Sequence, residues 1–179
     1  MLVLILSVSE TVRNRGTIRR YLDQPISQEN LIKIMESARL SQSAANRQPW
    51  QFIIVTDASM KKNLSKASRN QESISTAAAV IVCLANPSEA ARVGPFEGFL
   101  VDGSIAIENM ALTSWELGIG SCWIGAYDEK TIKELMEIPE PIQVISLLTL
   151  GYPNEKPKVK NRKILTDILH YERYGRKEP

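Results

Sequence analysis

Apolar residues along this 179-residue chain alternate between helical and strand-like spacing. Ser27 is a good N-cap, because its hydroxyl can accept from the free N–H groups of a first helical turn. Behind it, apolar residues recur every three or four positions, so we expect a one-faced helix that ends near Ser41. Similar spacing predicts a helical turn at 9–14, a helix at 59–66 and a helix capped by Asp128.

Continuous apolar runs predict four strands, at Gln51–Thr56, Ala77–Leu84, Ile119–Ile124 and Ile142–Leu150. In the first of these, Phe52 to Val55 should be buried on both faces. Because strands alternate with helices, the fold class is α+β or α/β, with helices packed on a sheet. The length favours one domain over 1–179, and from about 151 the tail should be extended and basic, with a short helix at 165–171.

The longest helix candidate, Phe99–Leu117, leaves little polar face. A helix that is apolar on most sides is buried on most sides. In so small a protein, this pattern requires a central position or a second chain. Gly118 is a suitable stop after it.

Charge and cysteine usage narrow the class of protein. The net charge of +2 is too small to imply a nucleic-acid or membrane partner. Two basic clusters, one near each end of the chain, could still converge on one anion. Cys83 and Cys122 lie in apolar runs without metal-ligand spacing, which suggests a reducing compartment. The apolar opening at 1–6 is too short for a membrane span and lacks a secretory signal's basic start, so we expect a cytoplasmic protein.

Four motifs follow one another along the chain. They are Arg-Gly-Thr-Ile-Arg-Arg-Tyr at 15–21, Ser-Ala-Ala-Asn-Arg-Gln-Pro-Trp at 43–50, Leu-Gly-Ile-Gly-Ser-Cys-Trp-Ile-Gly at 117–125 and Leu-Gly-Tyr-Pro at 150–153. The second leads into a strand that ends Val-Thr-Asp. In order and spacing, from about 15 to 174, the chain resembles the FMN-dependent nitroreductase family.

The resemblance implies a specific architecture and reaction. The fold would be α+β, with a mixed, mostly antiparallel central sheet flanked by helices and a long central helix at a homodimer interface. FMN would bind where the two subunits meet. NADH or NADPH would reduce the flavin at N5, and a nitroaromatic, quinone or similar small acceptor would then take the electrons in a ping-pong cycle. The cofactor carries this chemistry, so no side chain is assigned a catalytic role.

The first motif supplies candidate phosphate ligands. A phosphate needs cations or aimed N–H groups, and Arg15 and Arg19 are four apart, so on a helical turn they would share one face with Thr17 between them. The resemblance assigns Arg15, Gly16, Thr17 and Arg19 to FMN, with Gly16 contributing only backbone. Arg19 could also lie near flavin N1 and O2, where positive charge stabilises the reduced ring. The alternative is a solvated basic turn.

The second motif is rich in small residues and amides, which suit close approach to a flat ring and its imide edge. By resemblance, the partner subunit's copy of this loop would contact FMN. The residues concerned are Ser43, Ala44, Ala45, Asn46 and Gln48. The alternative for Asn46 and Gln48 is hydrogen bonding within the loop.

The third motif and the tail complete the expected site. The backbone of Ile124 and Gly125 would lie against the flavin near N5, with Ala126 where the family often has a second glycine, while Cys122 and Trp123 are expected in the core. By resemblance, Lys160 and Arg162 would form a second cationic arm for the phosphate, unless they are solvated tail charges.

Other functions stay open at this point. Within the same fold, the chain could be a dehalogenase, an enoate-type reductase or a flavin-fragmenting enzyme, but the segment 86–99 is short for a lid; Phe96 and Phe99 are its aromatics. Outside the enzymes, the chain could be a flavin-binding or nucleotide-sensing module. The arginines could also bind RNA. The lone histidine, His170, has no setting for a catalytic triad and is expected to be structural or exposed.

Overall fold

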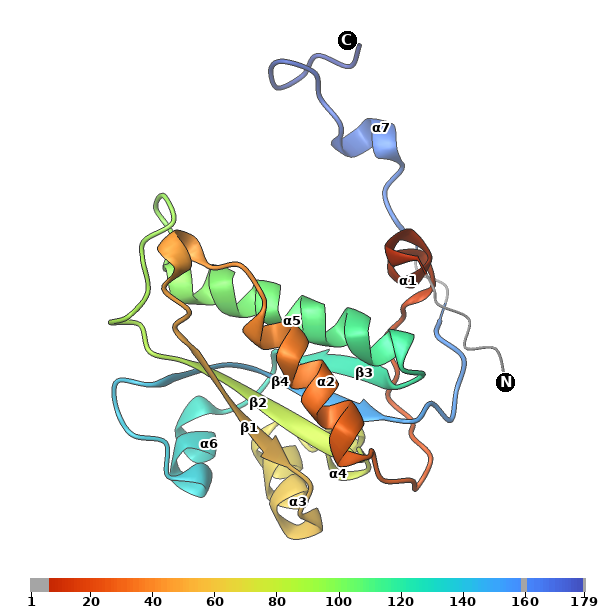
Figure 1. Ribbon diagram of the computed structural model, residues 1–179, viewed down its shortest axis with the longest axis vertical. Coiled ribbons are helices and arrows are strands. Elements are labelled where there is room, and N and C mark those ends of the chain that lie inside the picture. The colour runs from red at the N-terminus through yellow and green to blue at the C-terminus, as the bar shows by residue number, and fades with distance from the viewer. Residues whose placement is uncertain (1–6, 159–160, 179) are drawn as a thin grey trace.

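The computed structural model describes residues 7–158 and 161–178 (Figure 1). The apolar opening at 1–6 and Lys160 therefore lie outside the described residues. The helices are α1 (Val8–Asn14), α2 (Gln28–Arg39), a 3-10 turn η1 (Ala44–Asn46), α3 (Ala58–Ala67), α4 (Glu72–Ser75), α5 (Gly98–Glu116), α6 (Glu129–Met136) and α7 (Leu165–Ile168). The strands are β1 (Trp50–Val55), β2 (Ala79–Ala85), β3 (Gly120–Ile124) and β4 (Gln143–Gly151).

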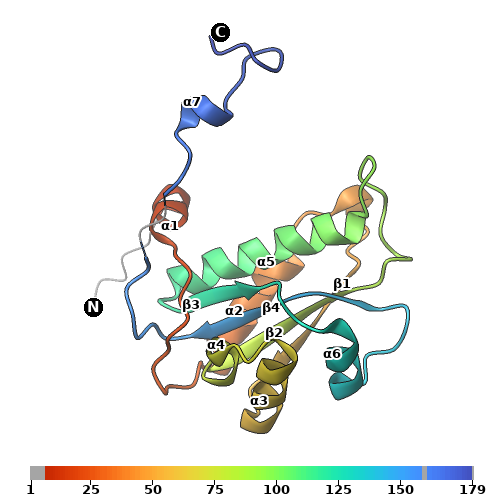
Figure 2. The same cartoon turned by 180° about the vertical axis from the view of Figure 1, so that it is seen from behind.

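The four strands form one antiparallel sheet in the order β1-β2-β4-β3. An isolated parallel bridge joins Thr17 to Ser121 at the β3 edge, so the sheet is mixed there. Helices α2 and α5 cover one face, and α3, α4 and α6 cover the other (Figures 1 and 2). A separate cluster of buried apolar side chains fills each of these two layers. The expected α+β class, with helices packed on a mostly antiparallel sheet, is confirmed.

The helix starts follow from local chemistry. Ser27 accepts a hydrogen bond from the N–H of Asn30 (3.2 Å), and Asp128 accepts from that of Thr131 (2.7 Å). Both predicted caps are confirmed. Asp57 ends the first strand and at the same time caps α3, because its carboxylate accepts from the N–H of Met60.

Strand β1 differs from the prediction. Only Val55 is buried among the residues expected to be covered on both faces, and Ile54 is 39% exposed. The reason is that β1 is an edge strand, so helices cover it less than its neighbour β2, whose residues are all buried. The sequence pattern of β1 is apolar enough for a central strand, but the sheet order decides its burial.

Helix α5 occupies the central position that its composition predicts. Its inner side, including Phe99, Met110 and Ala111, is buried against α2 and the sheet. It ends before Gly118, which has a φ of 73°. Its outer side keeps apolar residues in solvent, among them Leu100 at 47% exposure.

The tail after β4 leaves the body of the molecule. It passes beyond α1 and carries α7 away from the sheet (Figures 1 and 2). The predicted short helix is present over Leu165–Ile168. Within residues 7–158 and 161–178, no helix combines the length and apolar character that a bilayer crossing requires.

Candidate functional site

The first motif is extended, not helical. Helix α1 ends at Asn14, and the backbone N–H of Ile18 donates to the Ser121 carbonyl of β3 (2.9 Å). The proposed helical face for Arg15 and Arg19 is therefore wrong. In extended backbone, alternate residues share a side. Arg15, Thr17 and Arg19 consequently still lie together on the accessible side, while Gly16 and Ile18 point inward and are buried.

A pocket of about 250 Å³ opens beside Arg15. The Arg15 Nη2 donates to Glu108 Oε1 of α5 at 3.0 Å. The Arg15 Nε is buried and has no acceptor among the described residues. A buried donor without a partner is costly, so this corner of the pocket is suited to an incoming acceptor atom. The remaining walls combine polar and apolar groups, from Thr17, Ser104, Ile107, Ala111, Ser121, Trp123 and Leu148.

A second hollow of about 400 Å³ adjoins the first, because Thr17 lines both. It is formed by Thr17, Arg19, Arg20, Glu155 and Lys158. Glu155 accepts from the backbone N–H groups of Arg19 (2.7 Å) and Arg20 (3.2 Å), and the first of these bonds lowers the pKa of its carboxyl. The side chains of Arg19 and Arg20 form no ion pair among the described residues, so both guanidinium charges stay available to an anion.

The tail closes on the first motif at Gly16. A Cβ on Gly16 would lie 2.2 Å from the Cβ of Pro157, so glycine allows the tail to pack there. This contact brings Lys158 beside Arg19, as the idea of two converging basic segments requires. Arg162 is exposed and makes no ion pair or hydrogen bond with other described residues. The assignment of Lys160 and Arg162 to the phosphate stays a prediction.

The second motif forms a tight loop around η1. Ala45, Asn46 and Gln48 have positive φ values of 50°, 55° and 51°, a region that favours glycine. The Ser43 hydroxyl accepts from the N–H of Gln48 (3.0 Å), and the Gln48 side-chain amide donates to the Asn46 carbonyl (3.1 Å). For Gln48, the alternative of bonding within the loop is therefore realised. The Ala44 N–H donates to the buried carboxylate of Asp102 in α5 (2.9 Å).

The two motifs lie at different places along α5. The loop at 43–48 lies by the start of the helix, where Asp102 holds it, and α1 lies by the opposite end (Figure 2). Arg15 contacts Glu108, about two turns further along. Within the described residues of one chain, no hydrogen bond or ion pair links the loop to Arg15 or Arg19. A single copy of the chain therefore carries two separate parts of the expected site.

The third motif ends at the Arg15 pocket. Ile124 and Cys122 are buried, as expected for the inward side of β3. Trp123 is 58% exposed and lines the pocket, so its expected place in the core is wrong. The alternation of β3 turns Trp123 outward between two inward residues. A Cβ on Gly125 would lie 2.4 Å from the Trp123 ring, so glycine makes room for the indole. Strand alternation could have identified Trp123 as a site residue.

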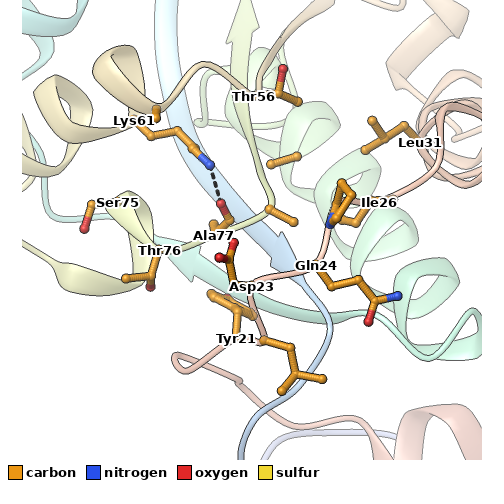
Figure 3. Close-up of a pocket in the computed structure, with 15 residues that line it drawn as sticks. Tyr21, Asp23, Gln24, Ile26, Leu31, Thr56, Lys61, Ser75, Thr76 and Ala77 are labelled. Atoms are coloured by element: carbon orange, nitrogen blue, oxygen red, sulfur yellow. Dashed lines mark hydrogen bonds between the residues drawn. The ribbon is translucent and has the colours of Figure 1, made fainter.

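A further cavity of about 530 Å³ lies away from these residues (Figure 3). None of the predicted site residues lines it. The Lys61 ammonium donates to the Ala77 carbonyl at 2.6 Å and ties α3 to the start of β2. Tyr21, the aromatic of the first motif, contributes its ring here, while its hydroxyl donates inward to the Ile18 carbonyl (2.6 Å). Tyr21 is therefore a core residue, and burial raises the pKa of its hydroxyl.

The remaining candidates have structural roles. The His170 ring accepts from the N–H of Gly175 through Nδ1 (3.1 Å) and packs against the Tyr174 ring in a tilted arrangement with centroids 4.5 Å apart, which folds the end of the tail. Phe99 is 4% exposed and belongs to the core, whereas Phe96 is 65% exposed. Of the two aromatics considered for a lid, Phe99 is excluded by its burial, and Phe96 lines a hollow on the outer face of α5, not the Arg15 pocket.

Comparison with known proteins assigns this arrangement to a family. The model of the Nitroreductase family matches residues 12–91 and 69–152. One relative is an Archaeoglobus fulgidus protein, provisionally named NADH dehydrogenase/NAD(P)H nitroreductase. It is 40% identical over 149 residues, covering 81% of this chain and 84% of the relative. An FMN reductase [NAD(P)H] of Bacillus subtilis is 27% identical over 189 residues, covering 93% and 74%. This chain belongs to the nitroreductase family.

Solved structures agree with this assignment. A nitroreductase family protein from Clostridium novyi NT superposes with a TM-score of 0.81 at 31% identity, covering 96% of both chains. The NADPH:FMN oxidoreductase of Vibrio harveyi, solved with NAD+, superposes with a TM-score of 0.85 at 25% identity, covering 93% of this chain and 77% of that one. The protein is therefore an FMN-dependent oxidoreductase that uses NAD(P)H.

Proposed function

We propose that this enzyme reduces nitroaromatics, quinones and similar small acceptors as a homodimer, with FMN bound between the subunits. The observation that carries the proposal is the buried, unpartnered Nε of Arg15 in a pocket that adjoins, through Thr17, a hollow lined by further cations. An unpaired buried donor beside Thr17 and Arg19 fits a phosphorylated, acceptor-rich ligand such as FMN.

The cationic end of the site comes from one subunit. Arg15 would bind through Nε, Thr17 through its hydroxyl, and Arg19 through its unpaired guanidinium, while Gly16 contributes backbone alone. Arg19 would stabilise the pyrimidine side of the ring, where negative charge develops on reduction. Lys160 and Arg162 would add a second arm from the tail, whose Pro157 packs on Gly16.

The ring would lie between the two subunits. On one side, the backbone of Ile124 and Gly125 would lie against the ring; these two residues directly follow Trp123, which lines the Arg15 pocket. The other side would be supplied by the loop at 43–48 of the second copy: Ser43, Ala44, Ala45, Asn46 and Gln48. Because no hydrogen bond or ion pair among the described residues links this loop to Arg15, the complete site would take its loop from the partner.

The outer face of α5 supports the dimer. An apolar patch on this face is formed by Phe96, Leu100, Val101 and Ile105. Exposing such a patch to water does not stabilise a monomer. A two-fold axis would pair the patch with its own copy. Two α5 helices packed antiparallel would bring the Asp102 end of one subunit toward the Glu108 end of the other. The loop of one copy would then approach Arg15 of its partner.

The tail gives a second reason for a partner. Ile164, Leu165 and Ile168 are each at least 60% exposed, although they belong to the short apolar segment around α7. The tail carries this segment away from its own core (Figure 1). A second copy of the chain is the surface that would bury it.

The chemistry divides between cofactor and protein. Bound FMN supplies the hydride chemistry, taking electrons from NAD(P)H and giving them to the acceptor. The protein binds the phosphate, fixes the ring between backbone and loop, and excludes water from its buried edge. No acid–base side chain is assigned, and a cytoplasmic location stays a prediction from the sequence.

An open pocket favours broad acceptors over a specialised substrate. The segment before α5 is short, and its Phe96 is largely in solvent. Phe99 is committed to the core, so it is not available to cover the ring. These features support nitroaromatic and quinone reduction more than the lid-dependent chemistry of a dehalogenase or an enoate-type reductase.

Stopped-flow spectroscopy tests this proposal. The purified protein is loaded with FMN, mixed anaerobically with NADH or NADPH, and then mixed with a nitroaromatic or a quinone. We expect the yellow colour to bleach with the nucleotide and to recover with either oxidant. A loaded protein that bleaches but transfers electrons to neither oxidant would contradict the proposed acceptors. A colourless protein that takes up no FMN would contradict the site itself.

A further inference from the structure

Asp102 is an unusual residue for the buried side of α5. Its side chain is 1% exposed, and only one of its carboxylate oxygens has a partner. That oxygen, Oδ1, accepts the N–H of Ala44 at 2.9 Å. The other, Oδ2, is buried and receives no hydrogen bond from any described residue. Burying a carboxylate with one oxygen unpartnered is costly. The one bond that this buried carboxylate does make, to Ala44, therefore indicates what the residue is there to do.

The loop that Asp102 holds is strained. Three non-glycine residues in it, Ala45, Asn46 and Gln48, have left-handed backbone. Such conformations persist only where surrounding contacts enforce them, and they cluster at ligand sites. The bonds within the loop, from Gln48 to Ser43 and to Asn46, shape it but do not fix it on the molecule. Fixing it on α5 requires bonds that leave the loop.

Two bonds to α5 do this. Asn109 donates to the Ser41 hydroxyl at 2.7 Å, just before the loop. Asp102 accepts from Ala44 at the first residue of η1, immediately before the strained residues. A carboxylate is a stronger acceptor for an N–H group than a neutral oxygen. Asp102 is therefore the contact that sets where the strained part of the loop lies.

We infer that Asp102 is a positioning residue, which holds the loop at 43–48 in the conformation that contacts FMN. The inference rests on the proposed function, because that loop is its proposed ring contact. Asp102 would act on the cofactor through Ala44, whose N–H it holds. Its role is to preorganise the loop, so that FMN binding does not have to order it.

The test compares three variants. Asp102→Ala removes the acceptor. Asp102→Asn keeps an acceptor oxygen for Ala44 while removing the charge and the unpartnered Oδ2. Ser114→Ala is the matched control, since Ser114 is fully buried on the same helix and donates only to the helix carbonyl of Ala111. The readouts are the FMN dissociation constant from flavin fluorescence and hydrogen exchange of the amides at 43–48.

For Asp102→Ala we expect FMN affinity to fall about tenfold or more, the loss of one charge-assisted bond, with faster exchange confined to 43–48. Asp102→Asn keeps a neutral acceptor for Ala44 but not the charge, so both readouts should lie between those of Asp102→Ala and the parent, and Ser114→Ala should change neither. If Asp102→Ala does not fold, Asp102→Ser, whose hydroxyl is too short to reach Ala44, takes its place.

Two results would overturn the inference. One is an alanine or serine variant with loop exchange and FMN affinity equal to those of Ser114→Ala. The other is an asparagine variant as impaired as the alanine one. Failure of the proposed function would look different. There, the parent protein itself would take up no FMN, while the effect of Asp102 on loop exchange would still be measurable.

Discussion

At the scale of single residues, the arginines of the first motif show what sequence can and cannot provide. The motif identifies Arg15, Thr17 and Arg19, but it places them on a helix that does not exist. Pairing of this segment with β3 makes it extended, and that pairing depends on residues a hundred positions away. Trp123 was assigned to the core because its neighbours are apolar. Only the register of β3 shows that it faces the pocket.

Arg15→Ala should weaken FMN binding. Arg15 presents a buried donor with no partner, and losing a charge-assisted contact costs roughly 1.5–3 kcal/mol, or about tenfold to a hundredfold in dissociation constant. Fluorescence titration with FMN measures this. Arg13→Ala is the control, because Arg13 is an exposed residue in the last turn of α1, two positions before Arg15. Equal FMN affinity in both variants would remove Arg15 from the site.

Cys83 should be unreactive in the folded protein. Burial raises the pKa of its thiol from 9.0 to about 12, so almost no thiolate exists at pH 8. Cys122 is also buried. A chromogenic disulfide reagent should therefore label neither thiol in native protein and both in denaturant. Rapid labelling of the native protein at pH 8 would show that the sheet around Cys83 opens.

The same shift predicts alkaline destabilisation. Below pH 9 the Cys83 thiol is neutral in both states, and its contribution to folding is complete. Between pH 9 and about 12 the unfolded thiol ionises while the folded one does not, so the free energy of unfolding should fall by about 1.4 kcal/mol per pH unit. Denaturant melts of the parent and of Cys83→Ala measure this. A pH slope unchanged by the substitution would contradict it.

At the scale of elements, local signals predict helices well and burial less well. Ser27 and Asp128 cap their helices as expected, because capping depends on a few neighbouring residues. The apolar composition of β1 suggests a central strand, yet β1 lies at the edge. The composition of α5 correctly predicts a central helix. It also leaves an apolar outer face that one chain does not bury.

Leu100→Glu should break the proposed interface. Leu100 is 47% exposed on the outer face of α5, and two copies of a glutamate would be buried near each other across a two-fold axis. We expect a smaller species in size-exclusion chromatography and weaker FMN retention. Ile32→Glu on α2 is the matched control, because Ile32 is 57% exposed on another helix. If Leu100→Glu elutes like Ile32→Glu and keeps its FMN, α5 is not the interface.

At the scale of the whole molecule, the order of four motifs gives the family, and the layout of the site along α5 supports the proposed dimer. The pocket at Arg15 and the loop at 43–48 are both formed in the single chain, yet no hydrogen bond or ion pair among the described residues links them. Sequence motifs place both sets of residues at FMN. The geometry along α5 supports the proposal, first made from the family resemblance, that they come from different subunits.

Sedimentation velocity, followed through the flavin absorbance over a range of protein concentrations, tests this claim directly. If each site is built from two subunits, FMN should sediment only with the dimer, and dilution into monomer should release it. A folded monomer that sediments with bound FMN would contradict the account.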